Sequence, residues 1–232
     1  MISFKFFRVF LTASLFAAAC RFWQPKTENA PLAAPPSVEE NKSGVPFATK
    51  EPEIFQTEIH TTATGAEEVI FTARNGANRL TVFDWGKKSE FALLQTAAGN
   101  SVLIARNQKI YAENQTANTG AADDVFPTAE LLNEKHAAHF EKLPPENNLV
   151  KYAVRFEDAP RTEIIMTIDP NINLPVKQEF YSVAGEQKTL LSTTELKNFS
   201  LQTDAHNFDL PTDYKKVSPP EFQEILRRER AQ

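Results

Sequence analysis

The sequence predicts a mainly β protein of the α+β class: an antiparallel sheet with one or two covering helices, preceded by a disordered tether. Three observations predict this class. From Ile54 onward, short stretches of alternating apolar and polar residues follow one another. Turn residues such as Asn75-Gly76 and Gly99-Asn100 separate them, and spacings of about 8 to 12 residues are typical of antiparallel hairpins. A stretch rich in proline and polar residues, without apolar periodicity, precedes Ile54.

The composition excludes several classes of protein. The chain has 232 residues, of which 41% are hydrophobic, and 18 of them are Phe, enough apolar mass for a core. The formal net charge is -5, whereas nucleic-acid binding needs clustered Lys and Arg, so we expect no nucleic-acid partner. Cys20 is the single cysteine, so neither an intrachain disulfide nor a cysteine-based zinc site can form.

Residues 1–19 have the order of an export signal. Lys5 and Arg8 precede an apolar run over residues 9–19, and the first eight residues contain no acid. A helix over this run is about 16 Å long, against about 30 Å of hydrocarbon, so it is too short to span a membrane. We therefore predict a cleaved signal peptide.

Cys20 follows three alanines, and a cysteine directly after small residues resembles the bacterial lipobox. In that lipoprotein family the cysteine sulfur receives a diacylglyceryl group, the signal is cut before it, and the new amine is usually acylated. The resemblance implies a mature chain that begins at Cys20 and is held on a membrane by its acyl chains. Ala17 departs from the Leu that the family prefers, and a plain secreted protein with a free thiol is the alternative.

Arg21 follows the cysteine, where the family's signal for inner-membrane retention has Asp. The resemblance therefore implies the outer membrane rather than the inner one, with the protein facing the periplasm. Residues 20–52 are predicted to be the lipidated cysteine and a disordered, proline-rich tether. Such a tether extends by up to about 3 Å per residue, so it can hold a domain tens of ångströms from a bilayer.

Ten alternating stretches predict about nine strands within a domain over residues 53–217. The alternating stretches cover residues 54–62, 67–73, 79–85, 89–96, 101–105, 109–113, 149–157, 161–169, 175–183 and 187–202. Because side chains alternate between the two faces of a strand, Leu80 lies with Val82, and Val102 with Ile104. We expect one face of the sheet to be buried.

Two helices complete the predicted fold. The first covers residues 128–142, with Thr128 as N-cap. Its apolar stripe recurs at spacings of three and four residues: Leu132, His136, Phe140 and Leu143. The second lies in residues 218–232, with Ser218 as N-cap and prolines in its first turn.

The ending FDLPTDYKKV at 208–217, the LPVK stretch at 174–177 and the hairpins at 74–84 and 101–113 carry a family resemblance. They are similar to the lipoprotein-localisation-factor-like families, LolA-like and LolB-like. The resemblance covers about residues 53–217. It implies an open, strongly curved antiparallel sheet, a half-barrel, whose concave side is covered by helices and can hold acyl chains. The family's periplasmic carriers are unlipidated, and none of their ligand-contacting residues matches a position here.

The sequence predicts neither a metal site nor a cofactor. His136 and His139 form H-x-x-H in the predicted helix, and a carboxylate beside them could complete a metal site. No third ligand is fixed by spacing, and H-E-x-x-H is absent. The chain also lacks G-x-S-x-G, a P-loop and a glycine-rich nucleotide motif, so we expect that the protein is not an enzyme.

Three functions remain open at this stage. The first, which we expect, is an anchored lipoprotein that binds a lipid or another hydrophobic ligand in lipid or lipoprotein trafficking. Leu132, His136, Phe140 and Leu143 would then line the ligand site, because an open sheet cannot leave its apolar face wet. The second is a structural or assembly lipoprotein with a self-filled core that binds envelope protein partners. The third is an enzyme with an unrecognised cleft.

We predict that Cys20→Ser prevents lipidation, so that the protein leaves the membrane fraction or accumulates as an unprocessed precursor. Metabolic labelling with a palmitate analogue tests this. The wild type should be labelled and the variant should not, because the cysteine sulfur is the acyl acceptor. Equal labelling of the two proteins would rule out Cys20 as the lipidation site.

Overall fold

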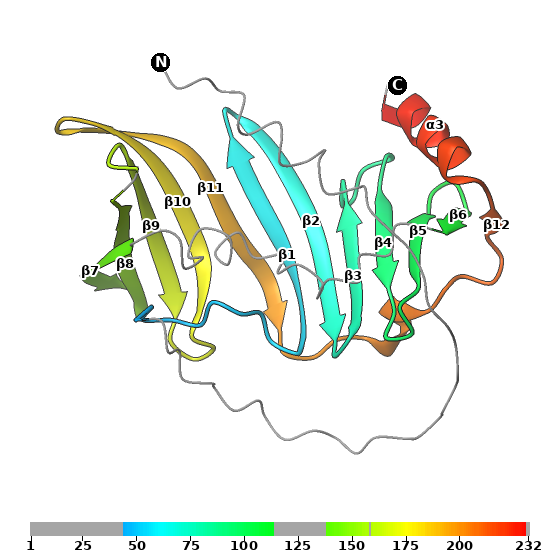
Figure 1. The fold of residues 1–232 in the computed structure, drawn as a ribbon, viewed down its shortest axis with the longest axis horizontal. Helices are drawn as coiled ribbons and strands as arrows, with labels where there is room; N and C mark the ends of the chain where they lie inside the picture. The colour runs from blue at the N-terminus through cyan, green and yellow to red at the C-terminus, as the bar shows by residue number, and fades with distance from the viewer. Residues whose placement is uncertain (1–43, 114–137, 158, 231–232) are drawn as a thin grey trace.

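One open sheet organises the described residues, 44–113, 138–157 and 159–230, of the computed structural model (Figure 1). Within these ranges the sheet has 12 strands in the order β12-β6-β5-β4-β3-β2-β1-β11-β10-β9-β8-β7. It does not close into a barrel, since β12 and β7 lie at opposite edges. The predicted mainly β, antiparallel, half-barrel-like fold is confirmed.

Two meanders make up this sheet. The first contains β1 (Ile54–Ala63), β2 (Ala66–Asn75), β3 (Asn78–Phe83), β4 (Phe91–Gln95), β5 (Ser101–Ala105) and β6 (Ile110–Glu113). The second contains β7 (Ala138–Glu146), β8 (Leu149–Phe156), β9 (Thr162–Asp169), β10 (Leu174–Ala184) and β11 (Gln187–Ser200). Antiparallel pairing of β1 with β11 joins them, and the short β12 (Lys215–Lys216) pairs in parallel with β6. The predicted hairpin strands are therefore confirmed.

The strand registers define two faces of the sheet, because paired residues point to the same side. We call one the Phe55 face: it carries Phe55 and Ile59 of β1, and Ile59 pairs with Ile70 of β2 and Leu196 of β11. We call the other the His60 face, after the neighbouring residue of β1. Every strand contributes side chains to both faces in alternation.

On the Phe55 face, the C-terminal helix α3 (Pro219–Arg230) covers strands β4–β6. Phe222 and Leu226 are buried there against Leu103 and Ile110. Ser218 caps the helix as predicted, since its hydroxyl accepts the Glu221 backbone N–H at 3.4 Å. Within the described ranges, helices fall short of the length and apolarity that crossing a bilayer requires.

On the His60 face, a second apolar cluster lies over strands β2–β6. Its buried members are Ala73, Leu80, Val82, Ala92, Leu94, Val102 and Ile104. Trp85 packs against this cluster. The connection after β11, which contains the 3-10 helix η1 (Ala205–Phe208), also packs against it, through Phe208 and Tyr214. Strands β4–β6 are thus buried on both faces.

The predicted helix over residues 128–142 is wrong at its C-terminal end. Ala138–Glu146 is strand β7, an edge strand whose Phe140 pairs with Val154 of β8. Asn147 and Asn148 both have positive φ and form the two-residue turn that joins β7 to β8. In this hairpin Phe140 lies beside Val154, which in turn pairs with Ile164 of β9. This strand pairing outweighs the helical spacing of the apolar residues. Residues 114–137 lie outside the described residues.

We predict that Phe222→Ala lowers the free energy of unfolding by about 3 to 5 kcal/mol, because it removes a fully buried ring that α3 packs against the sheet. Urea denaturation measures this change. Leu190→Ala is the matched control, since Leu190 is 50% exposed and its truncation should cost about 0.5 kcal/mol or less. Similar losses in the two variants would contradict the docking of α3.

Candidate binding site beneath the N-terminal strap

The residues before β1 form a strap, which we define as residues 44–53, at the ends of the strands (blue in Figure 1). Its backbone is fixed where the Ala48 N–H donates to the Asn173 carbonyl at 2.8 Å. Phe47 is 1% exposed and Glu51 6%, so the folded chain begins before the predicted domain boundary at residue 53. The polar composition of the predicted tether concealed this apolar anchor.

Phe47 fills an apolar cluster on the Phe55 face, which we call the Phe47 cluster. Its ring meets Phe140 of β7 edge-on, with centroids 5.8 Å apart, and lies 6.0 Å from the ring of Tyr152 of β8. The buried residues around it come from β8 and β9: Val154, Phe156, Ile164, Met166 and Ile168. A side chain from outside the sheet therefore covers three of its strands.

Farther along the strap, the Glu51 carboxylate lies against an arginine pair, Arg74 of β2 and Arg79 of β3. Arg79 donates from Nη1 to Oε2 at 3.2 Å and also contacts Oε1, and Arg74 Nη1 donates to Oε1 at 3.3 Å. The Glu51 and Arg79 side chains are only 1% and 5% exposed. Removing one member of such a buried pair costs about 3 to 5 kcal/mol, because the other charge is left buried.

Between its apolar ends, the Phe55 face combines a third apolar cluster, around Phe55, Ile59 and Leu174, with polar side chains. Thr57 and Thr72 are fully buried there, and Gln178 and Thr194 are nearly so. The threonine hydroxyls donate to backbone carbonyls, from Thr57 to Lys197 at 2.9 Å and from Thr72 to Leu80 at 3.3 Å. The expected lining of Val, Ile, Leu and Phe is therefore present on this face but interrupted by polar side chains between its two ends.

Two of the four predicted ligand-contacting residues can be placed. Phe140 lies in the Phe47 cluster, whereas Leu143 pairs with Lys151 and points to the His60 face, because residue 143 belongs to a strand. Leu132 and His136 lie outside the described residues. Sequence reasoning missed Phe47, Glu51 and the arginine pair. The one available signal was an aromatic residue followed by an acid within a proline-rich stretch.

On the opposite face, His60 bridges two carboxylates. Its Nδ1 lies 3.0 Å from Glu67 Oε1 and its Nε2 lies 3.0 Å from Glu58 Oε2, which belong to β2 and β1. Burial disfavours the imidazolium, but the hydrogen bonds to Glu67 and Glu58 outweigh it, so the pKa of His60 is raised. Among the described residues, no group of three or more His, Cys, Asp or Glu side chains is arranged to hold a metal ion.

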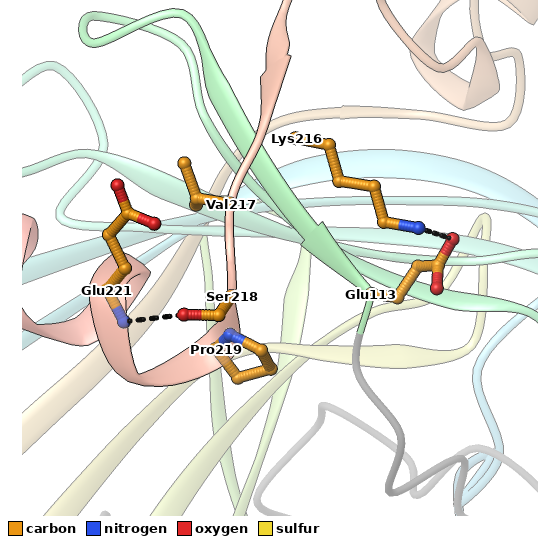
Figure 2. A pocket seen from close by; sticks show the side chains of 6 residues that line it. All are labelled: Glu113, Lys216, Val217, Ser218, Pro219 and Glu221. Atoms are coloured by element: carbon orange, nitrogen blue, oxygen red, sulfur yellow. Dashed lines mark hydrogen bonds and ion pairs between the residues drawn. The ribbon is translucent and has the colours of Figure 1, made fainter.

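A surface hollow of about 420 Å³ lies where α3 begins, lined by Glu113, Lys216, Val217, Ser218, Pro219 and Glu221 (Figure 2). Its polar side chains already have partners, as Figure 2 shows: Lys216 Nζ lies 2.6 Å from Glu113 Oε1, and Ser218 caps the helix. The hollow is open and lined by polar and apolar side chains alike, unlike the apolar Phe47 cluster.

No model of a known protein family matches this chain. A search among curated proteins also finds no match. Solved structures resemble it at low identity: MucB is 11% identical with a TM-score of 0.44, over 73% of this chain and 61% of MucB. A LolA superfamily protein from Nitrosomonas europaea is 15% identical with a TM-score of 0.28, over 70% of this chain and 90% of that one.

A putative outer membrane lipoprotein-sorting protein domain from Vibrio parahaemolyticus is 13% identical with a TM-score of 0.29. That alignment covers 78% of this chain and 94% of the Vibrio chain. This chain spans about three fifths of MucB's length, 61%. At these identities and TM-scores the likeness to all three structures is distant.

We predict that His60→Gln removes a pH-dependent part of the stability. Because the pKa of His60 is raised on folding, the imidazolium stabilises the fold fully below about pH 6.5, the unfolded value, and this contribution is lost as pH rises through the raised pKa. Urea unfolding at a series of pH values should show a steeper loss in wild type than in His60→Gln. His139→Gln, at an exposed histidine, should follow wild type. Identical slopes for wild type and His60→Gln would contradict the assignment.

Proposed function

We propose that this protein is an envelope lipoprotein, anchored through Cys20, whose sheet binds a hydrophobic ligand at the Phe47 cluster. One observation carries the proposal: an apolar area over three strands is covered by the Phe47 ring and Val45, both from a short segment outside the sheet. Fully burying a Phe side chain contributes about 1.5 to 3 kcal/mol, a modest amount that an acyl chain can match methylene by methylene. Binding rather than catalysis is the activity that this arrangement supports.

The predicted anchor fits a binding role near a membrane. Twenty-three residues lie between Cys20 and the first strap residue, Gly44. At about 3 Å per residue, a proline-rich chain of this length reaches up to about 70 Å, so the domain can approach its own membrane or work well away from it. Arg21 favours the outer membrane and a periplasmic position, as the lipoprotein resemblance implies.

The alternative is an assembly lipoprotein that binds protein partners and no lipid. The chain's own segments cover both ends of the Phe55 face, α3 at one end and the strap at the other, which favours this alternative. A partner would then bind elsewhere. Leu190 and Leu191, 50% and 44% exposed, lie on the β10–β11 hairpin where it extends past the end of β1 (Figure 1).

We predict that Phe140→Ala weakens retention of a fluorescent fatty acid at least fivefold, because Phe140 borders the site. The stability loss should stay below the about 3 to 5 kcal/mol of a fully buried Phe, since Phe140 is half-buried. Probe titration and urea unfolding of the full-length chain carrying Cys20→Ser measure both, without an acyl chain of the protein's own.

Phe71→Ala is the matched control, because Phe71 is also half-buried but stacks on Trp85 at 4.8 Å on the His60 face. It should leave probe retention unchanged. If wild type binds no probe and Phe140→Ala is severely destabilising, the Phe55 face is self-filled and the assembly alternative holds.

A further inference from the structure

We infer that the strap is a built-in competitor for the ligand site and that the ligand it imitates is an amphiphile with an anionic headgroup. The inference rests on the proposed hydrophobic-ligand function and adds a headgroup site, the arginine pair Arg74 and Arg79. The shared chemistry is an apolar chain ending in a carboxylate or a phosphate.

The order of side chains along the strap matches such a molecule. Val45 and Phe47 lie in the Phe47 cluster, and Ala48 packs beside Phe55 on β1. The carboxylate follows at Glu51, four residues after Phe47, a distance of at most about 13 Å in extended chain. The strap thus places apolar groups over β7–β9 and β1 and one buried negative charge, that of Glu51, over β2 and β3.

The arginine pair requires an anion. Arg74 and Arg79 are directly paired residues of neighbouring strands, so their charges lie side by side on the Phe55 face. Like charges directly opposite one another destabilise a sheet, and Glu51 relieves this by contacting both guanidinium groups. Guanidinium groups bind carboxylates and phosphates in the same two-pronged way. A ligand that displaces the strap must therefore bring its own negative charge, whereas a neutral amphiphile leaves the pair uncompensated.

The strap also lowers the apparent affinity of any ligand for this site. A ligand binds only the fraction of molecules in which the strap has left, so its apparent dissociation constant equals the intrinsic constant divided by that fraction. Weakening the strap should tighten binding of every apolar chain. The preference for an anionic headgroup should persist as long as the arginine pair does. These two effects separate the competitor from the headgroup site.

The test measures dissociation constants of dodecanoate, dodecyl phosphate and dodecanol, by calorimetry, on the full-length chain carrying Cys20→Ser. We expect both anions to bind at least tenfold more tightly than dodecanol, with their ratio showing which anion the site prefers. Glu51→Gln should tighten binding of all three at least tenfold. Glu53→Gln is the matched control: it removes an exposed carboxylate that also pairs with Arg74, and it should change binding by no more than twofold.

The double variant Glu51→Gln/Arg79→Gln removes both members of the buried pair and should reduce the preference for anions to within threefold. If Glu51→Gln does not fold, amide exchange in wild type replaces it: dodecanoate should speed exchange of residues 44–53, and dodecanol at equal concentration should do so far less. Equal binding of anions and dodecanol would overturn the headgroup site while leaving the hydrophobic site. No effect of Glu51→Gln beyond that of Glu53→Gln would overturn the competitor, and no binding of any probe would overturn the proposed function as well.

Discussion

The pairing of β1 with β11 is the interaction on which the rest of the structure depends. Each meander on its own is a series of local hairpins, but this ladder joins residues about 130 to 140 positions apart, as in the 3.3 Å contact between the hydroxyls of Thr61 and Thr194. Without it the chain would contain two separate sheets, each with an additional open edge. The ladder also sets the site, because the strap enters β1 at this junction and reaches Phe140 on one side and Arg79 on the other.

Different parts of the sheet are stabilised by different interactions, apolar packing in one and ion pairs in the other. Strands β4–β6 are buried on both faces and are correspondingly apolar. Strands β8 and β9 are apolar on the Phe55 face, whereas the His60 face of β8–β11 is charged, with Glu163 bound by Arg155 and Lys188. Burial opposes ionisation of Glu163, but these two cations outweigh it and hold its pKa below the usual range. On the His60 face, strands β8–β11 therefore depend on ion pairs, whereas strands β4–β6 depend on apolar packing.

Local chemistry made most of the fold predictable from sequence. Turn residues and alternation identified the hairpins because both act within a few residues, and Ser218 marked the start of α3 for the same reason. The β1–β11 pairing leaves no local signal. The helical spacing around Phe140 gave the wrong element because the Asn147-Asn148 turn decides the structure there, yet Phe140 reaches the candidate site from a strand.

The composition of residues 20–52 does not reveal the candidate site. A segment rich in proline and polar residues is typical of a disordered tether, and one Phe hardly changes that average. Contacts with residues distant in the sequence fix the strap. Phe47 packs against Phe140 and Tyr152, and Glu51 contacts two arginines that are paired across β2 and β3. Such complementarity depends on strand register, which sequence composition does not contain.

The position of the strap has a mechanical consequence for a protein held by its N-terminus. A pull transmitted along the chain towards Gly44 reaches the strap before it reaches β1. The strap is held by two backbone hydrogen bonds, from the Ala48 N–H to Asn173 and from the Gly76 N–H to Glu53, and by the Phe47 ring and the carboxylates of Glu51 and Glu53. Strand β1 is held by ladders on both sides over Ile54–Ala63. The strap yields first and the sheet keeps its shape. In the proposed lipoprotein, tension on the N-terminus would therefore uncover the Phe47 cluster while α3 still covers the other end of the Phe55 face, so that this junction would act as a force-sensitive element in series with a stiff sheet.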